Sequence, residues 1–220
     1  MAMTSYRLAD TSGRSPDPFI TIITLMPKDW EAAYKNGETP WDKGYASPPL
    51  AEYLTRAGVE GRVLVPGCGA GHDVRLLAGA GAEVLGLDIA PAALSQANAF
   101  AKAGNEAYLL GDFLNLPVGL HDGFDFVFEH TCLCALDPEL RPAYVRSVVD
   151  ALKPGGHLLA VFFNKVSNYS GGGPPHPIAL SEIDDLFAEH FAFIERCVPQ
   201  QTYPERPVGS EQLCLLQYPG

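Results

Sequence analysis

The fold is decided by the stretch 62–73, Arg-Val-Leu-Val-Pro-Gly-Cys-Gly-Ala-Gly-His-Asp. An apolar run ends here in alternating glycines and a helical pattern follows, which is typical of a buried parallel strand that enters a tight turn before a helix. Gly67 and Gly69 allow backbone conformations that other residues avoid and let a ligand approach the chain closely. The stretch therefore predicts an α/β fold with a ligand site at this turn.

A carboxylate follows the next apolar run. Asp88 lies about twenty residues after the first glycine, where nucleoside-binding α/β folds place the acid that accepts the ribose hydroxyls. A dinucleotide fingerprint, G-x-G-x-x-G, requires glycine at the position of His72. The glycines instead run G-x-G-x-G, the pattern of S-adenosylmethionine sites in Rossmann-like methyltransferases. We therefore expect a nucleoside pocket, with an ordinary strand-to-helix turn as the alternative.

The third and fourth predicted strands also end in polar or aromatic residues. Asp112 and Phe113 follow the third strand, where an acid and an aromatic ring can bind the adenine amino group and cover its ring. Glu129 and His130 follow the fourth strand. Because the carboxyl ends of parallel strands meet at one sheet edge, we expect all four residues near Gly67.

Alternating strand and helix patterns continue to the C-terminus, which predicts an α/β fold with seven mostly parallel strands and helices on both faces. A turn at 153–156 is expected before the fifth strand, and a long loop at 164–177 after it. Residues 26–220 are expected to form a single domain, preceded by an extension over 1–25 that is either disordered or adds an edge strand. The predicted strands are 62–67, 84–88, 107–110, 124–128, 157–163, 191–198 and 213–218.

Composition excludes several classes of protein. The chain has 220 residues and a formal net charge of -11, which argues against nucleic-acid binding because duplex affinity comes largely from Lys and Arg on phosphates. No apolar run approaches the roughly eighteen residues of a membrane span, and no signal peptide is recognisable. Five cysteines in mostly apolar runs predict reduced thiols and no metal site. We expect a cytoplasmic protein that binds neither membranes nor metals; its oligomeric state stays open.

Both tryptophans of the chain lie in one polar segment. Trp30 and Tyr34 are one helical turn apart, and Trp41 follows in a predicted turn. The segment is interpreted either as a helix that caps the core or as a lid whose aromatic faces contact a sulfonium cation. Composition favours neither.

These motifs resemble the S-adenosylmethionine-dependent thiopurine methyltransferase superfamily, and within it the plant and microbial halide/thiol (thiocyanate) methyltransferases. The resemblance runs from about Trp30 to the C-terminus. It rests on Thr-Pro-Trp-Asp-Lys-Gly at 39–44 together with Leu-Val-Pro-Gly-Cys-Gly at 64–69, and further on the segments 86–89, 111–113, 136–144, 152–156 and 172–175.

The resemblance implies a Rossmann-like class I methyltransferase fold with an N-terminal aromatic cover, and S-adenosyl-L-methionine as the cofactor. It implies cofactor contacts from five segments: Trp30, Tyr34 and Trp41 in the cover, Gly67, Cys68 and Gly69 at the methionine end, Asp88 and Ile89 at the ribose, Asp112 and Phe113 at the adenine, and Glu129 beneath the sulfonium.

The expected methyl acceptor is a small soft nucleophile, a thiol, hydrosulfide, thiocyanate or halide. It attacks the methyl carbon in line with the leaving sulfur, and this displacement needs alignment and desolvation more than a base. Cys132, Leu133 and Phe163 are expected to line an apolar acceptor pocket, and the resemblance implies Arg141 near it. His130 is interpreted as the base for a protonated thiol, or as a residue that fixes the cofactor or packs. Where the family resemblance implies a tyrosine at the end of the fifth strand that faces the methyl group, this chain has Phe162-Phe163.

Three alternatives remain open at this point. A member of the same family could act on a larger aromatic thiol, and a non-catalytic regulator could bind S-adenosylmethionine without turnover. A nicotinamide-dependent oxidoreductase is disfavoured by His72 in place of the third glycine.

Overall fold

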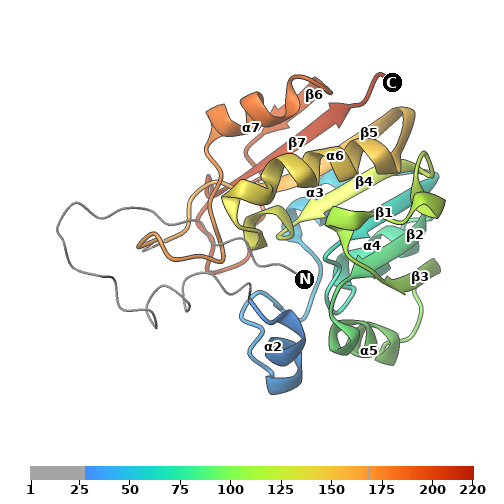
Figure 1. The fold of residues 1–220 in the computed structure, drawn as a ribbon, viewed down its shortest axis with the longest axis vertical. Helices are drawn as coiled ribbons and strands as arrows, with labels where there is room; N and C mark the ends of the chain where they lie inside the picture. Colours follow the sequence, from blue (N-terminus) through green and yellow to red (C-terminus); the bar gives the residue numbers. More distant parts are fainter. Residues whose placement is uncertain (1–27, 168) are drawn as a thin grey trace, which may run out of the picture.

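The computed structural model describes residues 28–167 and 169–220, so the extension predicted over 1–25 lies outside the described residues. Seven strands form one sheet with the order β3-β2-β1-β4-β5-β7-β6 (Figure 1). Only β7 runs antiparallel to its neighbours, β5 and β6, which confirms the mostly parallel sheet. The strands are β1 (Arg62–Pro66), β2 (Glu83–Asp88), β3 (Asn105–Leu110), β4 (Phe124–His130), β5 (Leu152–Phe163), β6 (Ala192–Cys197) and β7 (Glu211–Gln217).

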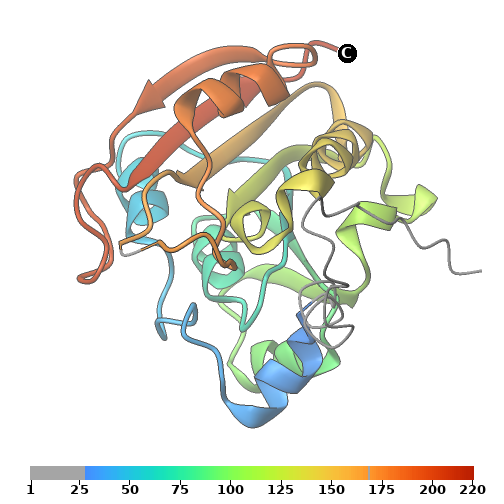
Figure 2. The same cartoon turned by 60° about the vertical axis from the view of Figure 1, so that its left-hand side comes forward.

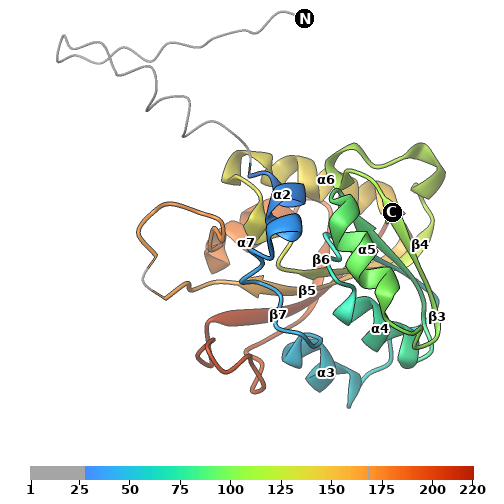
Figure 3. The ribbon, with the colours of Figure 1, turned by 90° about the horizontal axis from the view of Figure 1, so that it is seen from below.

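Helices cover both faces of this sheet, as the alternating pattern predicted (Figure 3). Side chains on successive strand residues point to opposite faces, so Val63 and Val65 pack with α3 and α4 while Leu64 packs with α6 and α7. All three are buried, and each contributes about 1.5–3 kcal/mol by leaving water. The helices are α2 (Trp30–Asn36), α3 (Pro48–Leu54), α4 (His72–Gly79), α5 (Pro91–Ala99), α6 (Arg141–Ala151) and α7 (Leu180–Phe187), with 3-10 turns at Phe113–Asn115, Val118–Leu120, Leu133–Ala135 and Pro138–Leu140.

The order of the strands positions the site. The chain passes from β1 to β2 on one side of β1, and after β3 it crosses to β4 on the other side of β1. The carboxyl ends of β1 and β4 therefore flank a crevice of the kind that binds ligands in open α/β sheets. Helix α2 packs beside α5 at the β3 side of the sheet, as Figures 1 and 2 show. The first described helix thus lies near the carboxyl ends of the strands.

One predicted turn is part of a strand instead. Strand β5 begins at Leu152, directly after α6, and includes the segment 153–156. Tyr218 explains the difference, since its carbonyl accepts from Gly155 N at 2.8 Å and its N–H donates to Gly156 O at 2.8 Å. A partner more than sixty residues away supplied the hydrogen bonds that a local turn would have supplied. Within residues 28–167 and 169–220, no helix has the length and apolarity needed to cross a membrane.

Candidate active site

A pocket of about 560 Å³ opens at the carboxyl edge of the sheet. Its volume falls within the roughly 300–1,000 Å³ of small-molecule sites. It is lined by the ends of β1, β2, β3, β4 and β5, by the N-terminal segment and by residues 203–207. Apart from Glu129, the predicted site residues at these strand ends therefore line one cavity.

The glycine turn, residues 67–71, forms the floor beside β1. Gly67, Gly69 and Gly71 have φ values of 57°, 54° and 73°, in the left-handed region that glycine tolerates. Gly69 N donates to the carboxylate of Asp88 at 2.8 Å, which ties the turn to the end of β2. A Cβ at Gly69 would lie 2.6 Å from Tyr34 Oη, so the turn is covered closely from above.

Asp88 lies at the end of β2 and is 6% exposed. Its two carboxylate oxygens accept from Gly69 N at 2.8 Å and from Ala90 N at 2.9 Å. Burial raises the pKa of this carboxyl above its ordinary value, against the lowering effect of the backbone N–H donors. Each oxygen has a second lone pair, and the residue lines the pocket beside the 55% exposed side chain of Ile89.

Asp112 and Phe113, the two residues expected at the adenine, have different surroundings. Asp112 lines the pocket and caps the following 3-10 turn, because its oxygens accept from Leu114 N at 2.9 Å and Asn115 Nδ2 at 2.6 Å. The Phe113 ring is 6% exposed and lies 5.0 Å from the Tyr144 ring, within the core. Phe113 also lines the pocket, although its ring packs into the core, and Leu114 adds a lining side chain that the sequence did not indicate.

The aromatic cover, residues 30–44, brings its three aromatic rings to the pocket. The centroids of Trp30 and Trp41 are 5.3 Å apart in an edge-to-face arrangement, and Trp41 Nε1 donates to Tyr34 Oη at 3.0 Å. Burial raises the pKa of the Tyr34 phenol, which keeps it protonated. Lys28 Nζ lies 4.8 Å and 4.3 Å from the two indole centroids, so the indole faces already attract a cation.

One end of the pocket, which we expect to take the methyl acceptor and call the acceptor end, is lined by His130, Cys132, Phe163, Tyr203 and Arg206. His130 Nδ1 is 2.9 Å from Asp73 Oδ2, and its Nε2 is 3.3 Å from Arg206 Nη1. Since Arg206 only donates, the ring accepts at Nε2 and donates from Nδ1. Both nitrogens of His130 are thus engaged by protein groups.

Arg206 links this histidine to a buried acid. Its Nη1 donates to Glu211 Oε1 at 2.5 Å, and Glu211 is 1% exposed. The guanidinium also lies over the rings of Phe163 and Tyr203, 4.6 Å and 5.0 Å from their centroids. The Tyr203 hydroxyl donates to Tyr45 O at 3.2 Å, so it does not replace the hydroxyl that Phe163 lacks.

Three thiols line the pocket, Cys68, Cys132 and Cys134. Burial raises the pKa of each, that of Cys134 to about 12, with the nearby acids Asp88 and Glu129 acting in the same direction. The pocket therefore holds these sulfurs in the protonated form. A Cβ at Gly67 would lie 3.0 Å from Cys132 Sγ, so the glycine turn and the acceptor end are adjacent.

Glu129, expected at the cofactor, and Leu133, expected at the acceptor, lie behind the pocket wall. Glu129 is fully buried, and its carboxylate accepts from Leu133 N at 2.8 Å and from the Tyr144 hydroxyl. This acid thereby holds the turn that contains Thr131, a lining residue with φ 64°, a costly conformation for a β-branched side chain. Glu129 fixes the wall instead of lining it.

Arg141, implied near the acceptor, also lies outside the lining. Its Nη1 donates to Glu182 Oε1 at 2.5 Å, and its Nη2 donates to the carbonyls of His176 and Pro177 at 3.0 Å and 3.1 Å. The loop that it holds carries Pro174 and Pro175 into the pocket lining. Arg141 acts on the pocket through this loop.

Sequence reasoning missed several lining residues. Asp73 follows the glycine turn directly and could have been suspected from its place in the motif. Tyr203 and Arg206 lie in the segment before β7, where neither spacing nor composition distinguishes them. Among the described residues, no group of three or more His, Cys, Asp or Glu could hold a metal ion.

Comparison with known proteins identifies the family. The family model of thiopurine S-methyltransferase (TPMT) matches residues 25–208. The chain belongs to this family. It is accordingly an S-adenosylmethionine-dependent S-methyltransferase, as the sequence resemblance implied.

Two plant relatives agree with this assignment. Thiocyanate methyltransferase 1 of Brassica oleracea is 32% identical over 196 residues, which cover 84% of this chain and 85% of the relative. Probable thiol methyltransferase 2 of Arabidopsis thaliana is 35% identical over 162 residues, 71% of this chain and 70% of the relative. The chain thus spans most of each relative.

A solved structure shows the same fold at lower identity. The Burkholderia thailandensis 1,6-didemethyltoxoflavin-N1-methyltransferase with bound S-adenosylhomocysteine superimposes with a TM-score of 0.65 at 19% identity, covering 98% of this chain and 92% of that chain. The Rossmann-like methyltransferase fold expected from the motifs is therefore confirmed.

Proposed function

We propose that this protein binds S-adenosylmethionine in the pocket at the sheet edge and transfers its methyl group to a small soft nucleophile, a thiol, hydrosulfide, thiocyanate or halide. One observation carries the proposal: a single cavity joins the glycine turn and Asp88 to an acceptor end of aromatic and sulfur-bearing side chains. The names of the thiocyanate and thiol methyltransferase relatives support the same acceptor class.

The residues fit this cofactor. The open lone pairs of Asp88 suit two ribose hydroxyls, and the apolar side chains of Ile89 and Leu114 suit the adenine. The indole faces that attract Lys28 Nζ suit the positive charge of a sulfonium. When bound, the cofactor supplies an electrophilic methyl group. Asp112 adds an acceptor for the adenine amino group.

The acceptor end desolvates the incoming nucleophile. Phe163, Cys132 and the proline pair of the 174–175 segment present apolar or weakly polar surface, which excludes water from an anion and leaves it reactive. Because a thiolate and not a thiol is the nucleophile, the raised pKa values of Cys132 and Cys134 keep the protein's own sulfurs from competing for the methyl group.

We assign His130 a positioning role in this reaction. Its Nδ1 is bonded to Asp73 and its Nε2 faces Arg206, which leaves neither nitrogen free to take a proton from a thiol. Acceptors that are already anionic are therefore preferred. The rate with thiols of different acidity is expected to follow the ionisation of each thiol, whereas a rate break at one fixed pH for all thiols would indicate a protein base.

The test is S-adenosylhomocysteine formation with iodide, bromide, thiocyanate, hydrosulfide, small thiols and an aromatic thiol. The proposal predicts the highest kcat/KM among the small soft acceptors. A higher value for the aromatic thiol would favour the larger-acceptor alternative. Cofactor binding without any product would favour a regulator.

Phe163→Tyr sharpens this test, because it adds a phenol hydroxyl at the end of β5. We expect the ratio of halide to thiol turnover to rise about tenfold or more, because a hydrogen bond to a charged group is worth about 1.5–3 kcal/mol. Phe193→Tyr is the matched control, since Phe193 on β6 also lies under an arginine, Arg196, at 4.5 Å, and lies outside the pocket lining.

A further inference from the structure

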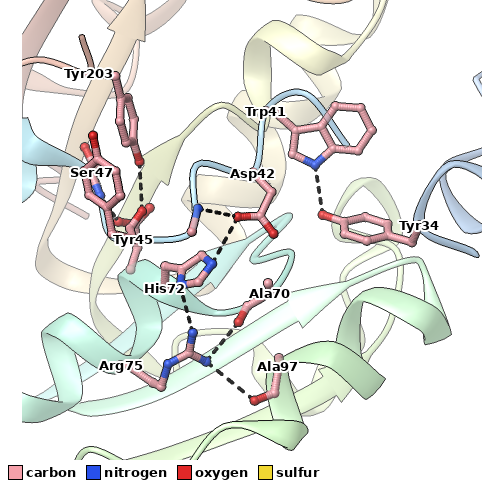
Figure 4. A network of polar contacts seen from close by, with 12 residues as sticks. Tyr34, Trp41, Asp42, Tyr45, Ser47, Ala70, His72, Arg75, Ala97 and Tyr203 are labelled. Atoms are coloured by element: carbon pink, nitrogen blue, oxygen red, sulfur yellow. Dashed lines mark hydrogen bonds and ion pairs between the residues drawn. The ribbon is translucent and has the colours of Figure 1, made fainter. Parts of the chain in front are cut away.

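His72, the residue in place of the third glycine, joins the glycine turn to the aromatic cover. Its Nε2 is 3.1 Å from Asp42 Oδ1, and its Nδ1 is 3.0 Å from Arg75 Nη2 (Figure 4). The two ring nitrogens thus face opposite partners, one on the cover and one on α4. The His72 and Asp42 side chains are 17% and 23% exposed, so the contact is largely sheltered from water.

The chemistry of the partners fixes the protons on this ring. A guanidinium has donors only, so Nδ1 accepts from Arg75, and Nε2 carries the proton and donates to the Asp42 carboxylate. The neutral ring makes both bonds. Arg75 is itself held, because its Nη1 donates to Ala70 O at 2.9 Å and to Tyr108 Oη at 3.3 Å, and it lies 4.1 Å over the Phe100 ring.

Asp42 connects His72 to the rest of the cover. The same Oδ1 accepts from Gly44 N at 2.8 Å, which fixes the turn that carries Trp41. Trp41 in turn donates to Tyr34 (Figure 4). The Tyr34 hydroxyl lies 2.6 Å from the position that a Cβ would take at Gly69. The chain of contacts therefore runs from α4 through the cover and back to the glycine turn, around the pocket.

We infer that the row Arg75–His72–Asp42 is a latch that holds the aromatic cover over the cofactor, with His72 as a positioning residue that sets how long the cofactor stays bound. The inference rests on the proposed function in one respect, that the cofactor binds beneath this cover. Ser47 N, just after the cover in the sequence, donates to Asp73 Oδ1 at 2.7 Å, and this bond holds the end of the cover beside α4. Opening of the cover then requires the contact between His72 and Asp42 to break.

The first experiment needs no cofactor. Trp30 and Trp41 are the only tryptophans of the chain, so tryptophan fluorescence reports on the cover alone. Acrylamide quenching is expected to increase in His72→Leu, which has neither donor nor acceptor, and to stay near wild type in His72→Gln, whose amide can accept from Arg75 and donate to Asp42. His157→Leu, at a histidine outside the pocket lining, is the matched control.

The second experiment measures the dissociation rate of S-adenosylhomocysteine by stopped-flow fluorescence. We expect about a tenfold faster rate in His72→Leu, the equivalent of one hydrogen bond to a charged group, and less than about a threefold change in His72→Gln. Equal rates and equal quenching in His72→Leu and wild type would overturn the latch. An increase in His72→Gln as large as in His72→Leu would also overturn it. The cause would then be the packing of the His72 ring against the Phe100 ring, whose centroid lies 5.6 Å away.

Asp42→Ala provides a second route if His72→Leu does not fold. Its dissociation rate is expected to rise at least as much as in His72→Leu, because Asp42→Ala also removes the bond from Gly44 N. The double variant should be no faster than Asp42→Ala, because both changes remove the contact between His72 and Asp42. Additive effects would contradict a shared latch. If wild type binds no S-adenosylhomocysteine, the proposed function fails, whereas the quenching experiment still decides whether His72 holds the cover.

Discussion

The two ends of the pocket are built in different ways. At the cofactor end the central bond joins Gly69 to Asp88, 19 residues apart and at neighbouring strand ends. At the acceptor end the bonds of His130 reach Asp73 and Arg206, 57 and 76 residues away, and Tyr203 bonds Tyr45 across 158 residues. Local main-chain geometry therefore makes the cofactor end, and side chains from distant segments make the acceptor end. Substitutions at the first should reduce binding, and those behind the second should change turnover.

Asp88→Ala should have the largest effect. It removes the proposed ribose acceptor and leaves Gly69 N and Ala90 N without their partner, so we expect the affinity for S-adenosylhomocysteine to fall about 100-fold or more. Isothermal titration calorimetry measures this affinity, and Asp185→Ala on the exposed face of α7 is the control. Affinity equal to that of the control would contradict the cofactor end as described.

Arg141→Met should impair the acceptor end of the pocket and leave the cofactor end nearly unchanged. Without the bonds to His176 O and Pro177 O, the loop that carries Pro174 and Pro175 loses its support, and kcat/KM for the acceptor should fall about tenfold. The dissociation constant for S-adenosylhomocysteine should change by less than about twofold. Arg146→Met, an exposed arginine of the same helix, is the control. An equal loss in cofactor affinity would show that the ends are not independent.

Glu129→Gln tests the buried acid behind the wall through pH. Burial raises the pKa of Glu129, so the folded state binds its proton more tightly than the unfolded state. Stability is therefore lost as pH rises from the ordinary carboxyl pKa through the raised one, by up to about 1.4 kcal/mol per pH unit. The variant lacks this loss, so its unfolding free energy relative to wild type should increase over that interval. Parallel pH profiles in urea titrations would contradict the prediction.

Glu205→Gln should have the smallest effect. Glu205 and Lys43 join the segment before β7 to the cover with 2.5 Å between charged atoms, but their side chains are 50% and 24% exposed. Exposed pairs contribute about 0–1 kcal/mol and are screened by salt. We expect less than about a twofold change in the KM for either substrate. A change that approaches tenfold and disappears at high salt would mean that this pair also clamps the pocket.

The difference between local main-chain contacts and contacts from distant segments also explains which site residues the sequence could predict. The glycine turn and Asp88 follow from periodicity and from short spacings, and both lie in the pocket lining at the sheet edge. The order of the strands was not predicted and comes from the structure alone. Arg206 and Tyr203 were missed because their partners, His130 and the carbonyl of Tyr45, are distant in the sequence, and no local pattern records such a contact. Glu129 was expected at the cofactor and Arg141 near the acceptor, and both lie outside the pocket lining. Sequence alone does not tell whether a side chain lines a wall or supports it.

The most direct test of the account is calorimetric titration of thiocyanate into the protein saturated with S-adenosylhomocysteine. If one pocket holds cofactor and acceptor side by side, thiocyanate should bind this complex without displacing S-adenosylhomocysteine. Its binding should weaken in Arg141→Met and persist in Arg146→Met. Displacement of S-adenosylhomocysteine by thiocyanate, or binding that is unchanged in Arg141→Met, would contradict an acceptor end adjacent to a separate cofactor end.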